Sequence, residues 1–444
     1  MQKRLSLVLL FVAASAFAKS SLTIPPINYT HRTLANGLEV YSVRDTATPT
    51  VAIHVWYRVG SKSDPDHRSG FAHLFEHIMF KSTKNMAAEM LDRLTEDVGG
   101  FNNATTRDDA TIYYEVVPSN YLETLLWAEA ERMGSLTVDE NNFKSERDVV
   151  KEEYRYRVLA PPYGRFYNAI DKDSFVVHPY RRPGIGSIED LDASTITDVQ
   201  AFHSTFYRPD NAVLVVAGDF EQAQLDAWID KYLGAIPRPS APIPRVTVKE
   251  PPRKAAKKVA EHGPSVPLPA VAITWLAPAT SSPDAPALDV AAAILAQGES
   301  SRQYQSLVYR KKIAQDTQAY ADLREDLGLF GVLATMASGH TAAEGEKALM
   351  TEVRALAEKP VPSAELQKAK NLLIADALRD RETNNGKAFS LGNAIVVEHD
   401  PAEVNRGLVA LEAVTVADVQ RVVRKYMIDG KPVVITYTAE GGAK

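Results

Sequence analysis

The sequence repeats parts of itself at one constant spacing. The tripeptide Val-Ala-Ile stands at 51–53 and again at 271–273, and the pattern Thr-x-x-Asp-Val-Gln stands at 195–200 and again at 415–420. Because the same offset links both ends of a long segment, we interpret the chain as two copies of one domain, each of about 200 residues. A chain of 444 residues can give each copy a packed core of its own.

A proline-rich segment at 236–269 separates the two copies. It holds nine of the chain's 26 prolines, together with a basic run at 253–258. Proline disrupts helices and central strands, so we expect a linker here, with the basic run as a solvated part of it. The expected domains are then 19–235 and 270–444.

Each copy mixes two kinds of hydrophobic pattern. Alternation of apolar and polar residues predicts strands, and apolar residues at every third or fourth position predict helices. The strands are expected over 39–43, 52–58, 111–117, 212–216 and 432–436, and the helices over 121–133, 143–158 and 346–357. Because strands follow one another directly, hairpins are favoured. The predicted class is α+β, with a mostly antiparallel sheet packed with helices in each copy.

Residues 1–18 have the pattern of a secretory signal. A basic start at Lys3 and Arg4 precedes an apolar stretch over 5–12, and residues 16–18 form an A-x-A cleavage site. The alternative is a membrane anchor, but the apolar stretch is well short of the roughly 20 residues that span a bilayer. We therefore expect an exported protein without a membrane span, in the periplasm of a Gram-negative bacterium.

The composition excludes several kinds of function. The chain has no cysteine, so disulfides, thiolate metal ligands and a cysteine nucleophile are excluded. Its formal net charge of -6 gives no electrostatic basis for binding nucleic acid.

The pattern His73-x-x-Glu76-His77 is the strongest candidate for chemistry. Residues four apart on a helix share a face, so the two imidazoles can bind one cation. Glu76 stands beside that cation and can take a proton from the attacking water without being a ligand. The alternative is the polar face of an ordinary surface helix, which a five-residue pattern alone does not exclude.

Two observations favour a metal site. The other residues between Phe71 and Phe80 are apolar, so the helix is expected to be buried on most sides, and its polar groups need partners. In the second copy, the equivalent positions hold Ala293, Ala296 and Gln297. A fold that needed the polar group would carry it in both copies, so we interpret the group as function added to one of them.

A catalytic zinc needs a third protein ligand and an open position for water. The acidic segment at 145–157 offers Glu146, Glu152 and Glu153. Glu146 and Glu153 share one helical face, whereas Glu152 points about 100° away. Helix geometry therefore leaves Glu146 and Glu153 as the candidates.

With these motifs, the chain resembles the inverzincin group of pitrilysin, insulin-degrading enzyme and the mitochondrial processing peptidase. The resemblance covers nearly the whole chain after the signal. In that group the third zinc ligand is a glutamate about 76 residues after the second histidine, which implies Glu153 beside His73 and His77. The resemblance also implies that Glu76 is the general base and that Glu146 is a second acidic residue of the catalytic site.

The segment 99–113 resembles the edge strand with which that group pairs its peptide substrate. Its Gly-Gly-x-x-Asn-Ala-x-Thr pattern places Asn103 and Ala104 at the substrate. The resemblance therefore implies a Zn²⁺ endopeptidase, which binds extended peptides at a sheet edge inside a clamshell chamber.

One part of the group's site is missing from this chain. The group uses a second-domain arginine and a tyrosine seven residues later to hold the substrate, and Arg310 fits, but Thr317 stands in place of the tyrosine. Tyr320 comes three residues late and is expected to point elsewhere on a strand. The resemblance then implies the zinc-bearing subunit of a heterodimer whose homologous partner supplies this half-site, with a homodimer as a second possibility.

Two other functions fit less well. A non-catalytic assembly subunit would be expected to lose part of the metal motif, which is complete here. In a secreted metal-binding protein, Glu76 would have no role.

Overall fold

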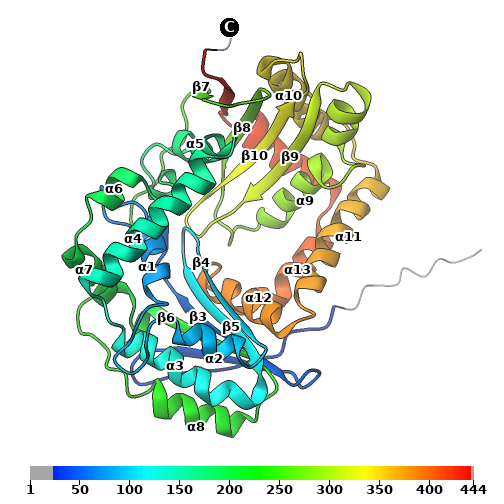
Figure 1. Cartoon of the computed structure of the whole chain (residues 1–444). Helices are drawn as coiled ribbons and strands as arrows, with labels where there is room; N and C mark the ends of the chain where they lie inside the picture. The colour runs from blue at the N-terminus through cyan, green and yellow to red at the C-terminus, as the bar shows by residue number, and fades with distance from the viewer. Residues whose placement is uncertain (1–23, 442–444) are drawn as a thin grey trace, which may run out of the picture.

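The computed structural model describes residues 24–441. Figure 1 shows an open ring in which two β-sheets lie at opposite ends, with helices between and around them. The predicted signal at 1–18 lies outside the described residues and stays a prediction. No helix between residues 24 and 441 combines the length and the apolar character needed to cross a bilayer.

The first sheet has six strands, in the order β1-β2-β6-β3-β5-β4. Their bounds are β1 (Thr30–Thr33), β2 (Glu39–Arg44), β3 (Thr50–Tyr57), β4 (Phe101–Thr106), β5 (Thr111–Pro118) and β6 (Ala212–Gly218). β2 and β6 are parallel, and every other neighbouring pair is antiparallel. β4 pairs only with β5, so its other edge is open.

The second sheet repeats this arrangement with five strands, in the order β7-β11-β8-β10-β9. Their bounds are β7 (Lys257–Gly263), β8 (Ala270–Ala277), β9 (Ala314–Asp322), β10 (Gly328–Met336) and β11 (Val433–Ala439). β7 and β11 are parallel, and the other pairs are antiparallel. The order and directions match those of β2-β6-β3-β5-β4, so the predicted duplication and the predicted α+β class are confirmed.

A layer of helices covers one face of each sheet. The first layer consists of α1 (Phe71–Ile78), α3 (Leu122–Ser135), α7 (Ile196–Phe206) and α8 (Gln222–Tyr232). The second consists of α9 (Ala285–Ala296), α10 (Ala342–Glu358), α11 (Ser363–Asp380) and α14 (Val416–Val422). α7 and α14 begin with the same capping box, formed by Thr195 with Asp198 and by Thr415 with Asp418. The repeated sequence pattern therefore starts a helix in both copies.

Each half of the chain gives one helix to the sheet of the other half. α5 (Gly164–Ser174) packs Phe166 and Ile170 against the second sheet. α12 (Asn384–Val396) packs Leu391 and Ile395 against the first sheet. The two helices start at equivalent positions of the repeat, so the exchange is reciprocal. The predicted domain ranges describe the repeat along the sequence, but each sheet is covered on one face by the other half.

The segment predicted as a linker contains a strand. Residues 237–256 form neither helix nor strand, but β7 starts at Lys257 and pairs with β11. The predicted linker at 236–269 therefore includes an edge strand of the second sheet. The stretch 253–263 has no proline, so its N–H groups can pair with a neighbour, and an edge strand tolerates exposed lysines such as Lys257 and Lys258.

Candidate metal centre

The helix α1 starts at a glycine and is capped by a buried aspartate. Gly70 has a φ of 94°, in the left-handed region, and turns the chain into the helix. The carboxylate of Asp64 accepts hydrogen bonds from the N–H of Gly70 (2.7 Å) and of Ala72 (2.9 Å), which have no partner inside the helix. This cap fixes the start of the helix at Phe71, two residues before His73.

The apolar side chains of α1 cover most of the helix surface. His73, Glu76 and His77 occupy the remaining face. Phe71, Leu74, Phe75 and Ile78 are at most 2% exposed and belong to the core under the first sheet. The opposite face lies against α4 (Glu140–Tyr154), whose start is capped by the Asp139 side chain. The arrangement presents the polar side chains of α1 to those of α4.

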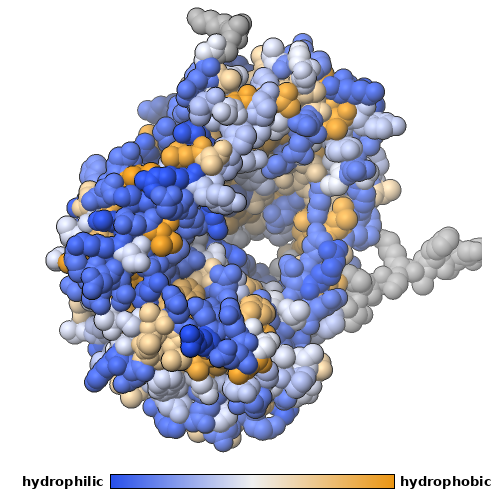
Figure 2. All heavy atoms as spheres, viewed as in Figure 1, coloured by the Kyte–Doolittle hydropathy of each residue, from blue (hydrophilic) through white to orange (hydrophobic). Residues whose placement is uncertain are grey.

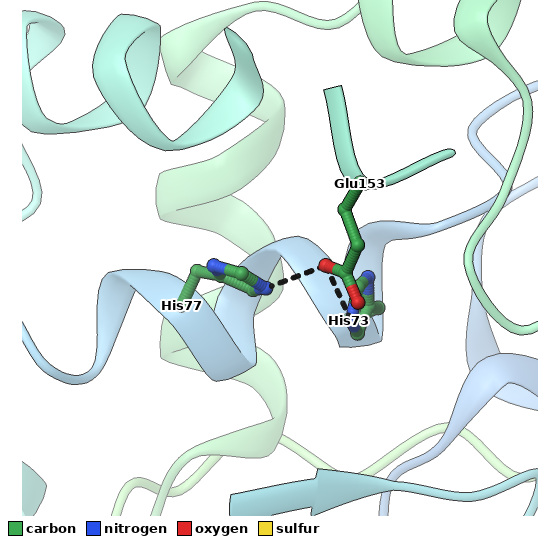
Figure 3. Close-up of side chains that lie close together, drawn as sticks. All are labelled: His73, His77 and Glu153. Carbon is green, nitrogen blue, oxygen red and sulfur yellow. Dashed lines mark ion pairs between the residues drawn. The ribbon is translucent and has the colours of Figure 1, made fainter. Parts of the chain in front are cut away.

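His73, His77 and Glu153 converge between these two helices, as Figure 3 shows. The Glu153 Oε2 atom lies 3.3 Å from His77 Nε2 and 3.6 Å from His73 Nε2. All three ligand atoms lie within 4.8 Å of one another. In a tetrahedral zinc site with bonds of about 2.0–2.2 Å, ligand atoms are roughly 3.4 Å apart. The donor set and its spacing therefore fit zinc, and three protein ligands leave a position open.

The two histidines have pKa values shifted in opposite directions. Burial, and then the neighbouring His77, lower the pKa of His73 to about 4, so this imidazole is neutral and able to bind a metal. Burial alone would lower the pKa of His77, but Glu146 and Glu153 raise it to about 9. A metal ion bound at Nε2 would therefore have to displace a proton from His77, as is usual for a basic ligand.

Glu146 lies behind His77 rather than among the three converging atoms. Its Oε2 atom is 3.6 Å from His77 Nδ1, and its Oε1 atom is 2.9 Å from Lys81 Nζ. The side chain is only 6% exposed. A carboxylate on Nδ1 orients the ring and directs Nε2 to the metal position. Glu146 thus contacts His77 and not the three converging atoms, and Lys81, which the sequence reasoning missed, balances its charge.

Glu76 is held by a residue from the edge strand. Thr106, the last residue of β4, donates a hydrogen bond from Oγ1 to Glu76 Oε2 at 2.5 Å. Burial raises the pKa of Glu76, while the hydrogen bond from Thr106 opposes the shift. A general base is most effective when its pKa is close to the working pH, and burial moves Glu76 in that direction.

The predicted substrate residues lie on β4, which is confirmed as an edge strand. Ala104 turns its side chain into the core, and its N–H donates to Asn103 Oδ1 at 2.7 Å rather than to a neighbouring strand. Asn103 is exposed. An extended peptide could take the place of the Asn103 side chain at this N–H.

The second-domain residues are not brought to the zinc position. Arg310 is exposed at the end of a π-helical segment, η6 (Tyr304–Arg310), and makes no hydrogen bond or ion pair within residues 24–441. Thr317 is buried on β9, and Tyr320 packs over Gly331 among residues that contact the opposite face of the second sheet. The prediction that Tyr320 points elsewhere is confirmed.

The counterpart of this site in the second half is packed with apolar residues. The positions equivalent to Glu146 and Glu153 are held by Leu366 and Leu373, which pack against the second core with Ala293. Gln297 donates a hydrogen bond to Asp376 on α11. The second half therefore has the same fold without these polar side chains, so the fold does not require them.

Comparison with known proteins agrees with this division of the chain. Residues 39–165 match the family model described as "Insulinase (Peptidase family M16)", and residues 194–373 match "Peptidase M16 inactive domain". The chain is 33% identical over 397 residues to the zinc protease PqqE of Helicobacter pylori, and the alignment covers 88% of each protein. The chain belongs to peptidase family M16. All five predicted metal and catalytic residues of this M16 chain lie in the part that matches the insulinase model.

Two further relatives extend the M16 assignment. A solved structure of a protease from Helicobacter pylori has a TM-score of 0.90 and 30% identity, covering 93% of this chain and all of that one. A probable mitochondrial-processing peptidase subunit beta of Arabidopsis thaliana is 25% identical, over 89% of this chain and 76% of its own length. The resemblance stated from the motifs is therefore confirmed at the level of the family.

The position of Glu146 predicts its effect on metal binding. Glu146→Gln should weaken zinc binding roughly 10–100-fold, the range typical of a partner that orients a ligand, because Nδ1 of His77 loses its carboxylate. Titration with a competing chelator measures the change. Glu140→Gln, the same substitution at an exposed residue of α4, is the control and should leave the affinity unchanged. Equal affinities for both variants would contradict the role of Glu146.

Proposed function

We propose that this M16 chain is a zinc-dependent endopeptidase that hydrolyses extended peptides. The observation that carries the proposal is the convergence of His73, His77 and Glu153 next to a glutamate, Glu76, that is oriented but not a ligand. A site that only stored or buffered zinc would have no use for a held carboxylate beside an open position. The zinc-protease name of a relative that is 33% identical supports the same function.

The residues of the site have different roles in hydrolysis. Zinc, when bound by His73, His77 and Glu153, supplies Lewis acidity that polarises a carbonyl and makes a nearby water more acidic. Glu76 keeps Oε2 on the Thr106 hydroxyl, which leaves Oε1 to accept the proton of the attacking water. The same carboxylic acid then returns the proton to the leaving amine. Glu76 thus acts as base and acid in turn.

The substrate would lie along the open edge of β4. Strand addition uses backbone hydrogen bonds, so it favours extended peptides over folded proteins. The strand ends at Thr106, whose hydroxyl touches Glu76, so a peptide on this edge passes the general base. Asn103 and Ala104 are the proposed contacts, with Arg310 as a contact made in an assembled chamber.

We also propose that the chain works as the zinc-bearing subunit of a pair. Figure 2 shows the molecule hollowed at its centre, and a cavity of about 1340 Å³ extends between α9, α12 and α13 (Glu403–Ala413), with Arg107 in its lining. Two such chains facing each other would enclose a chamber. The relative from Arabidopsis thaliana is named as a subunit, which supports this assembly. A homologous chain that carries the tyrosine missing at Thr317 is the preferred partner.

The second candidate function is that of a non-catalytic assembly subunit. The match of 194–373 to a model described as inactive favours it. The complete metal motif in 39–165 weighs against it. Export to the periplasm stays a proposal that rests on the pattern at 1–18.

Metal content and peptide cleavage separate these candidates. An endopeptidase should contain zinc, cleave a quenched fluorescent peptide and lose that activity with a chelator. A non-catalytic subunit should show no chelator-sensitive cleavage, either alone or with a partner that itself lacks the metal motif. Zinc without cleavage, under every pairing, would leave only a metal-binding role and would overturn the proposal.

The same assay tests the pairing. If the half-site is missing, the chain alone should bind zinc but cleave slowly, and a homologous chain with the arginine and tyrosine should raise turnover by about tenfold or more through better placement of the carbonyl. Because Thr317 is buried, Thr317→Tyr would crowd the core and is a poor substitute for the partner. Full activity of the chain alone, unchanged by the partner, would contradict the heterodimer.

A further inference from the structure

The turn between β4 and β5 is held by a set of charged and polar side chains from both halves of the chain. Figure 1 shows this hairpin meeting the turn between β9 and β10 near the centre of the ring. We call the side chains that join them the hairpin clasp. It consists of Lys62, Asp108, Asp109, Tyr180, Arg324 and Glu325.

Asp109 is the centre of the clasp. It is 7% exposed and accepts hydrogen bonds from the Tyr180 hydroxyl (2.5 Å) and from the Glu325 N–H (3.0 Å). Lys62 Nζ lies 2.8 Å from its carboxylate and 2.5 Å from that of Glu325. One lysine therefore joins a carboxylate of the first half to a carboxylate of the second.

Asp108 ties the hairpin to the second half by another route. Its Oδ1 atom accepts a hydrogen bond from the Ser61 hydroxyl at 2.7 Å, and its Oδ2 atom lies 3.2 Å from Arg324 Nη1. Arg324 also pairs with Asp171 on α5 at 2.9 Å. The Arg324 side chain is only 7% exposed, so its charge depends on these carboxylates.

The backbone of the β4–β5 turn is also held in place, by hydrogen bonds from residues 61 and 62. The N–H groups of Ser61 and Lys62 donate to the carbonyl oxygens of Arg107 and Asp108, both at 3.1 Å. A Cβ atom on Gly60 would lie 2.2 Å from the Arg107 oxygen, so the seat requires a glycine. The turn therefore has one position relative to both halves.

The hairpin clasp is close in sequence to Thr106, which contacts the proposed general base Glu76. Asp108 and Asp109 follow Thr106 by two and three positions, and Thr106 donates to Glu76 Oε2. A shift of the turn would move the Thr106 hydroxyl with it. We propose that the clasp, and Asp108 with Arg324 in particular, positions the end of β4 so that Thr106 orients Glu76 for hydrolysis. The second half, which lacks the metal ligands, thereby contributes positioning residues to the site of the first.

This inference rests on the proposed peptidase function, and its test begins with a mild variant. Asp108→Asn keeps an acceptor for Ser61 but removes the charge that faces Arg324. It should lower kcat about tenfold, since small displacements of a positioned group have effects of this size. Zinc affinity should not change. Tyr180→Phe, which removes one partner of Asp109, is a second variant and should act in the same direction.

A double variant separates positioning from general destabilisation. If the clasp acts through Thr106, Asp108→Asn should change kcat by less than about twofold in a Thr106→Val background. Losses that multiply in the double variant would overturn the proposal. The control is Asp45→Asn. This variant breaks an ion pair between Asp45, directly after β2, and Lys387 of the other half. β2 is four strands, or about 19 Å, from β4 in the sheet.

Amide hydrogen exchange of the full chain tests whether the clasp holds β4, without any activity assay. Amides of β4 should exchange about tenfold faster in Asp108→Asn, while those of α1 and β10 keep the wild-type rate. Unchanged exchange in β4 would overturn the proposal. If the wild-type chain cleaved no peptide in any pairing, the proposed function would fail, and faster exchange would still show that the clasp holds β4.

Discussion

Glu76→Gln should reduce peptide hydrolysis about 10²–10⁴-fold and leave zinc bound, which is the usual effect of removing a general base. Glutamine has the size of glutamate and can still accept the hydrogen bond from Thr106, but it cannot take a proton from water. His73, His77 and Glu153 are untouched by the change, so metal content should equal that of the wild type.

The measurement is kcat with a quenched fluorescent peptide, together with zinc per chain by elemental analysis. Glu96→Gln, the same substitution at an exposed residue of α2 (Met90–Glu96), is the matched control. Cleavage at the wild-type rate by a fully zinc-loaded Glu76→Gln variant would remove Glu76 from the mechanism.

Glu153→Ala should release the metal, whereas its neighbour Glu152 should be dispensable. Glu153 supplies the oxygen that lies within reach of both imidazoles, and the Glu152 side chain is 73% exposed and pairs with Arg155. The loss of zinc affinity in Glu153→Ala should exceed the roughly 10–100-fold typical of a residue that only orients a ligand. It should therefore also exceed the loss in Glu146→Gln.

The two variants form a matched pair, because both remove a carboxylate from adjacent positions of one helix. Zinc content and activity of Glu152→Ala should match the wild type. Equal zinc occupancy in both variants would exclude Glu153 as a ligand and would leave Glu146 as the candidate for the third ligand.

The repeat and the motif spacing predicted most of the fold, and they named the three side chains, His73, His77 and Glu153, that lie close together. The constant offset between the copies anticipated two sheets of one topology, and helical periodicity placed Glu146 and Glu153 on the face that meets α1. These features depend on neighbours along the chain, which is why a sequence pattern can contain them. The strand β7 was missed because proline density was averaged over a segment that includes a proline-free stretch.

The contacts that complete the site could not be predicted in the same way. Thr106 stood inside a recognised segment, but only the folded sheet edge shows that its hydroxyl reaches Glu76. Lys81 comes four residues after His77, yet its partner Glu146 is far away in sequence. Arg324 and Asp108 belong to different halves of the chain. Contacts of this kind depend on tertiary packing and leave no local periodicity.

The reciprocal placement of α5 and α12 has a bearing on how such a chain could arise. If a single ancestral domain carried the equivalent helix, that helix would have packed on the sheet of a second molecule, as in a domain-swapped dimer. Joining two copies through the segment at 236–269 turns an exchange between molecules into one within a single chain. The fused copies no longer need to be identical, so one copy can hold His73, His77 and Glu153 where the other holds Ala293, Gln297 and Leu373.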